Sequence, residues 1–122
     1  MPNAFSKRKL FPPIPGLSIA AAAAASGVPA ASLAAPDRGR ARIARARQYA
    51  VYLHHVALSA SLSACARQFR RDRATMRHAC AVIENLRDAP RFDLAAARME
   101  RAVAAQRDMV LALLADCEGA AQ

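Results

Sequence analysis

The chain contains no tryptophan and few aromatic or β-branched residues, a shortage that argues against a β-sheet fold. Aromatic residues make up 5% of its 122 residues, whereas alanine, arginine and leucine dominate. Strands are enriched in aromatic and β-branched residues, and helices in the three residue types that are abundant here. The composition therefore predicts an all-α protein, and the length predicts one small domain with a modest core.

Long hydrophobic runs are also missing. No segment approaches the roughly twenty strongly apolar residues that a membrane-spanning helix needs. A basic stretch, 7–9, precedes an alanine run, 20–25, and superficially resembles a secretory signal. Pro12, Pro13 and Pro15 interrupt that apolar stretch where it should begin, so the pattern is a poor signal peptide. We expect a cytoplasmic protein with no membrane partner.

Residues arranged for catalysis or metal binding are scarce. Cys65, Cys80 and Cys117 are widely spaced and lack the close pairing of a zinc or redox site, so we expect buried, reduced thiols. The adjacent His54 and His55 point to different helix faces and would not converge on one ion, and we expect them on a polar surface. No carboxylate pair or glycine-rich loop has catalytic spacing. The sequence predicts no enzyme, no cofactor and no metal site.

Residues 1–36 contain six of the seven prolines and much of the alanine and serine. Such low-complexity composition is typical of a disordered tail. We therefore predict a disordered tail over 1–36, whose removal leaves the melting temperature nearly unchanged. The folded domain is expected over 37–117, followed by a flexible C-terminus at 118–122.

Positive charge is concentrated in one segment of the chain. Between Arg38 and Arg91 there are twelve arginines against three acidic residues, a net charge of +9 that equals the charge of the whole chain. Neutralising phosphates releases condensed counterions, so a concentrated basic segment is typical of nucleic-acid binding. A solvated helical surface is the alternative explanation for such charge.

The same segment carries the pattern of a helix-turn-helix. Helices are predicted over 37–58, 62–69, 73–87 and 94–117, with Ser61 and Asp72 as N-caps of the second and third. A short helix, a tight turn at Arg70-Arg71 and a longer helix with a basic outer face are typical of this motif. The predicted inward residues of the last helix are Met99, Val103, Val110, Leu113 and Leu114. Its end is apolar nearly all round, which favours core packing for the first half and a partner for the last turns.

Residues 42–104 resemble the C-terminal DNA-binding domain of the bacterial replication initiator DnaA. The resemblance begins at 44–48, Ala-Arg-Ala-Arg-Gln, beside the family's Ala-Arg-Pro-Arg-Gln. It is strongest at 71–80, Arg-Asp-Arg-Ala-Thr-Met-Arg-His-Ala-Cys, beside Arg-Asp-His-Thr-Thr-Val-x-His-Ala. Arg73 and Ala74 replace the family's His and Thr, and one residue is missing before Arg71, where the family usually has a glycine.

The resemblance implies a DNA-binding site. The base-contacting residues would be Arg71, Asp72, Arg73, Ala74, Thr75 and Arg77. The phosphate contacts would come from Arg42, Arg45, Arg47, Ser61, Leu62 and His78. Arg38 and Arg40 flank Gly39, which aligns with the family's minor-groove arginine, and either one would take its place. Arginine favours guanine and an alanine methyl favours thymine, so we expect the preferred site to differ from the initiator's own box.

The chain has no Gly-x-x-x-x-Gly-Lys-Ser/Thr loop, and therefore no ATPase motif. We expect a nucleoid-associated, sequence-specific double-stranded DNA-binding regulator of transcription, because similar modules occur in regulators of phage-like elements and gene transfer agents. The C-terminal helix would bind a second copy or a protein partner, either the transcription machinery or a co-activator. The alternatives are a replication modulator that occupies initiator boxes and a protein-binding adaptor that keeps the fold.

Overall fold

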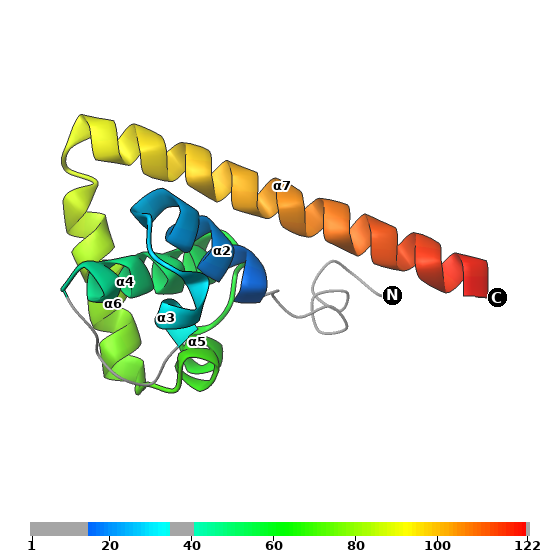
Figure 1. Cartoon of the computed structure of the whole chain (residues 1–122), viewed down its shortest axis with the longest axis horizontal. Coiled ribbons are helices and arrows are strands. Elements are labelled where there is room, and N and C mark those ends of the chain that lie inside the picture. The colour runs from blue at the N-terminus through cyan, green and yellow to red at the C-terminus, as the bar shows by residue number, and fades with distance from the viewer. Residues whose placement is uncertain (1–14, 35–40, 122) are drawn as a thin grey trace.

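The computed structural model describes residues 15–34 and 41–121, and every regular element in these stretches is a helix. The all-α class and the predicted helix-turn-helix are confirmed. Element labels follow Figure 1. The helices are α2 (Pro15–Ser26), α3 (Ala30–Ala34), α4 (Ala41–Val56), α5 (Leu62–Phe69), α6 (Arg73–Leu86) and α7 (Pro90–Ala121).

Helix α4 lies at the centre of the molecule. Its residues from Tyr49 to His54 are all buried, so that part of the helix is covered on every side. Helices α2 and α3 pack against it, as do α5, α6 and α7 (Figure 1). The sequence there, Tyr-Ala-Val-Tyr-Leu-His, has largely apolar side chains on every side, as expected for a helix in the middle of a core.

The predicted disordered tail is wrong for residues 15–34. Helix α2 lies between α4 and α7 (Figure 1), and its Ser18, Ala22 and Ala23 are buried. Alanine has the highest helix propensity, and its small side chain lets neighbouring backbones approach closely. Pro15 is tolerated in the first turn, and Gly27 follows the helix with a φ of 69°. A composition typical of disorder therefore forms a packed helix here, because the alanines have surfaces to pack against.

Helix α7 is longer than predicted at both ends. It begins at Pro90, because proline is favoured at the first helical position, and it continues through the expected flexible terminus as far as Ala121. Of the residues predicted to face inward, Val103 is buried, Met99 packs against the core and Val110 is half-buried. Leu113 and Leu114 are exposed by 58% and 44%, so that prediction is wrong for them. The last turns of α7 project past the body of the domain (Figure 1).

Arg87, at the end of α6, joins α4 to α7. Its guanidinium donates to the Tyr52 hydroxyl at 2.8 Å, to Asp93 Oδ1 at 2.6 Å and to Glu100 Oε1 at 2.5 Å. Burial is the main reason that the pKa of Tyr52 is raised to about 12. This group of hydrogen bonds fixes the start of α7 and offsets part of the negative charge of the two carboxylates.

The three thiols occupy different environments. Cys65 is buried, and burial raises its pKa to about 11. Cys80 is half-buried and Cys117 is exposed. The expectation of buried thiols is therefore wrong for Cys117, because it lies on the projecting turns of α7. Within 15–34 and 41–121, no helix has the length and apolar character needed to cross a bilayer.

Candidate DNA-binding surface

Helix α5 begins where the sequence predicts, at a serine cap. The backbone N–H of Ala64 donates to Ser61 Oγ at 3.0 Å, which satisfies one of the N–H groups that a helix start leaves unpaired. Cys65 and Phe69 are buried on the inner side. Ser61 is exposed and Leu62 half-buried, so this helix start lies at the surface, where a phosphate contact is predicted.

The turn between α5 and α6 is tight, and an arginine occupies its left-handed position. Arg70 has φ 56° and ψ 46°, and the N–H groups of Arg70 and Arg71 both donate to the Ala66 carbonyl. This is the region usually taken by glycine after a helix. The Arg71 side chain donates to the Phe69 carbonyl at 3.3 Å, which holds it beside the turn. The turn lacks the glycine that the family usually has there. Arg70 takes the left-handed conformation instead, which strains its backbone.

Asp72 is the N-cap of α6. The backbone N–H of Thr75 donates to Asp72 Oδ1 at 2.7 Å, and this hydrogen bond lowers the pKa of the carboxyl group below its usual value. Asp72 Oδ1 therefore already accepts a hydrogen bond that stabilises the first turn of α6. Asp72 positions the residues that follow, whatever it contacts on DNA.

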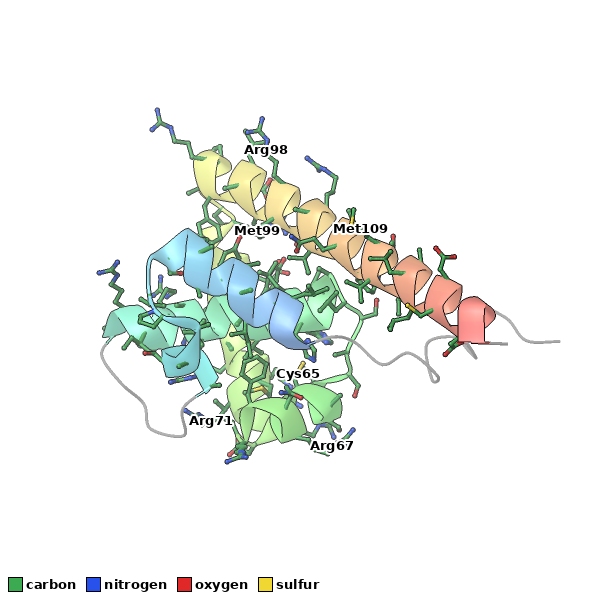
Figure 2. All side chains as sticks on the ribbon, turned by 45° about the vertical axis from the view of Figure 1, so that its right-hand side comes forward. Cys65, Arg67, Arg71, Arg98, Met99 and Met109 are labelled. Atoms are coloured by element: carbon green, nitrogen blue, oxygen red, sulfur yellow. The ribbon has the colours of Figure 1, made fainter. Side chains whose placement is uncertain are left out.

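The first two turns of α6 present the predicted base-contacting residues to solvent. Arg73, Ala74 and Arg77 are exposed, as is His78. On the opposite face Met76, Ala79 and Ile83 are buried. Arg73 and Arg77 are four residues apart and share one side of the helix. Figure 2 shows Arg71 and Arg67 at this same end of the molecule, far from Arg98 on α7.

A cleft of about 360 Å³ separates the N-terminal halves of α4 and α6. Cationic and polar side chains from both helices and from the turn line it together with apolar ones, and the apolar part of the lining is the larger. The lining residues are Ala44, Arg47, Gln48, Val51, Arg71, Thr75, Met76, His78 and Ala79. Thr75, Arg71 and His78, which the sequence assigned to DNA, are thus brought together beside α4.

The arginines of α4 do not form one surface. Arg42 donates to the carbonyls of Ser26 and Gly27 at 3.1 and 3.3 Å, and Arg47 donates to those of Ser32 and Leu33, both at 3.1 Å. These carbonyls end α2 and α3, where helix dipoles leave partial negative charge.

Arg47 is only 7% exposed, which conflicts with its predicted phosphate contact. Arg42 is exposed, although its side chain already has partners. Arg45 is exposed and donates to Gln48 at 3.2 Å, so it is the arginine of α4 best placed for a phosphate. Arg38 and Arg40, predicted for the minor groove, lie outside the described residues.

His54 is buried, which corrects the expected surface position. Its Nδ1 lies 3.4 Å from Ser18 Oγ, and its ring meets Phe69 edge-on at 6.1 Å between centroids. Burial, together with a smaller effect of the neighbouring His55, lowers the pKa of His54 to about 4. The Nδ1 of His55 lies 2.6 Å from the Ala60 carbonyl. Both histidines therefore have structural positions, in contact with residues at or beside the two ends of α5.

Residues 19–83 match the family model described as the bacterial DnaA protein helix-turn-helix. The matched range covers just over half of the chain. The chain belongs to the DnaA C-terminal helix-turn-helix family. It is thereby a DNA-binding protein, and α5, the turn and α6 form its helix-turn-helix. No curated protein and no solved structure shows a significant match to the chain.

The extent of the family match corrects two boundaries. It begins at Ile19, within α2, so half of the segment expected to be disordered belongs to the family domain. It ends at Ile83, so α7 lies beyond it, whereas the resemblance was expected to reach residue 104. Helix α2 was missed because its alanines carry no sequence signature.

Proposed function

We propose that this DnaA-family module is a sequence-specific regulator of transcription. The observation that carries the proposal is the exposure of Arg73, Ala74 and Arg77 on the first turns of α6, next to the capped turn. In the family this part of the helix enters the major groove. Arg73 and Ala74 stand where the family has His and Thr, so the module would recognise a site of its own.

The chemistry of these side chains supports recognition of bases. An arginine donates two hydrogen bonds to the N7 and O6 acceptors of guanine, and an alanine methyl packs against the methyl group of thymine. Each well-formed contact of the first kind discriminates against the wrong base by about 1–3 kcal/mol. Residues Arg73 and Arg77 would therefore specify sequence, whereas Arg45, Ser61 and His78 would hold the phosphates and fix the register.

A second candidate function is modulation of replication through the initiator's own binding sites. Asp72, Thr75 and His78 retain the family's residues, and Thr75 and His78 line the cleft beside α4. This part of the surface is compatible with the initiator's box. The changed Arg73-Ala74 pair favours a DNA sequence different from the initiator's box, which supports the transcriptional role over this one.

The test is a selection from a random duplex DNA library at near-physiological salt, with the initiator's box present as a control. The proposal predicts enrichment of a motif unlike that box, located near promoters in the host genome. Enrichment of the box itself would support the replication role instead. Weak, salt-sensitive binding without enrichment would contradict both, because phosphate contacts alone give binding without sequence preference.

A further inference from the structure

Helix α7 has an exposed face directed away from the body of the domain, which we call the outer face. Its residues follow each other at alternating spacings of three and four, as along one side of a long helix. They are Ala95, Arg98, Ala102, Ala105, Met109, Ala112 and Asp116, and all seven are exposed. The inner side of the same helix carries the buried Ala96 and Val103.

Charge is separated along the outer face. Arg98 lies near one end and Asp116 near the other, with small or apolar residues between them. Within the described residues no ion pair joins Arg98 to a carboxylate, and those of Asp93 and Glu100 accept hydrogen bonds from Arg87. Met109, in the middle of the face, is 66% exposed. Figure 2 shows Arg98 pointing outward from α7, on the side away from the body.

The residues of the outer face are self-complementary about position 107. Arg98 and Asp116 lie at equal distances on either side of that position, as do Ala102 and Ala112, and Ala105 and Met109. In an antiparallel pair of identical helices, residues at equal distances from the centre lie opposite each other. We propose that two copies of the chain associate through the outer faces of α7, antiparallel to each other.

In this arrangement opposite charges meet at both ends of the contact. Arg98 lies against the partner's Asp116, and its own Asp116 lies against the partner's Arg98. A parallel pair would instead bring like charges together at both positions, which is repulsive. Between the charges, Met109 packs against the partner's Ala105, and the alanines allow the close approach that helix pairs need. From 98 to 116 the contact extends about 27 Å along the helix.

The association places the two DNA-binding ends on opposite sides of the dimer. In Figure 1 the start of α6 and helix α5 lie on the far side of the molecule from α7. A twofold axis that pairs the outer faces therefore turns the two motifs in opposite directions. Together with the DNA binding of the family, this geometry would join two duplexes or two distant segments of one duplex.

The association itself is tested without DNA, so it can fail independently of the proposed function. Sedimentation equilibrium of the full chain is expected to show a reversible dimer. Asp116→Arg places Arg98 opposite a like charge at both ends of the contact. It is expected to raise the dimer dissociation constant at least about tenfold. The same applies to Arg98→Glu. Combining Arg98→Glu with Asp116→Arg exchanges the two charges and is expected to restore the dimer to within about threefold of the original constant.

Glu118→Arg is the matched control. It makes the same change of charge two residues from Asp116, which places it on the other side of the helix. Its dimer constant is expected to stay within about threefold of the original. A chain that stays monomeric at every concentration would overturn the proposal. So would equal weakening by Asp116→Arg and Glu118→Arg, or a double variant that is as weak as either single one while all variants remain helical by circular dichroism.

Discussion

At the scale of single residues, the arginines of the basic segment divide into two groups. Arg42 and Arg47 donate to the last carbonyls of α2 and α3, whereas Arg45, Arg73 and Arg77 face solvent. In the sequence these residues look alike, because the burial of Arg47 depends on helices that come from another part of the chain. Positive charge at the start of α4 is thus stabilised in part by helix ends within the fold.

Arg70 is the residue whose replacement should most simply stabilise the fold. Its φ of 56° is unfavourable for any residue with a Cβ atom and costs about 1 kcal/mol relative to glycine. Arg70→Gly is therefore expected to raise the free energy of unfolding by about 0.5–1 kcal/mol, measured by urea denaturation.

Arg70→Ala is the control for this change. It removes the same charge and keeps the Cβ atom, so its stability should not rise. If both variants are stabilised equally, the gain comes from lost charge repulsion and not from relief of the backbone.

His54 should make the stability of the fold depend on pH. Its pKa is about 4 in the folded chain, whereas an unfolded histidine titrates near 6.5. Below pH 6.5 the unfolded chain therefore binds a proton that the folded chain does not, and stability falls until about pH 4. The full loss is at most about 3 kcal/mol. The effect of Asp72 starts lower, because its pKa lies below the ordinary value of 3.8.

Urea denaturation of the purified chain between pH 7 and pH 4.5 measures this effect. His54→Leu should remove most of this fall in the free energy of unfolding between pH 7 and pH 4.5, whatever the stability of the variant at pH 7. His78→Gln changes an exposed histidine and should leave the fall intact. A profile that is flat in the original chain, or that His78→Gln abolishes, would contradict the buried neutral state of His54.

At the scale of elements, the local signals predicted α5 and α6 to within one residue. The caps at Ser61 and Asp72 and the inward stripe of α6 depend only on neighbouring residues, so the sequence contains them fully. Helix α2 could not be predicted in the same way. Its stability comes from packing between α4 and α7, and alanine-rich composition does not distinguish a packed helix from a tail.

The packing of α2 predicts a sharp difference between neighbouring alanines. Ala22 is fully buried, whereas Ala25 is exposed on the same helix. Ala22→Glu buries a charge and is expected to lower the free energy of unfolding by at least about 3 kcal/mol. Ala25→Glu makes the same change at the surface and should stay within about 0.5 kcal/mol. Equal, small effects in thermal denaturation would show that α2 is not part of the core.

At the scale of the whole molecule, two regions of different character lie on opposite sides. The helix-turn-helix of α5 and α6, where we propose that DNA binds, lies at one end, and the outer face of α7 lies beyond the family match. The family domain was recognisable in the sequence because its cap, turn and helix residues form one continuous motif. The outer face could not be recognised in the sequence, because which residues of α7 are exposed depends on the side of the helix that the body covers.

The central claim is that the first turns of α6 determine which DNA sequence the chain binds. The most direct test is a parallel selection from random duplexes with the original chain and with the double variant Arg73→His, Ala74→Thr, which restores the family's residues. The account predicts two different motifs, and the motif of the double variant should shift towards the initiator's box at the base pairs facing these residues. Identical motifs from both proteins would contradict it, because α6 would then not be the part of the chain that distinguishes bases.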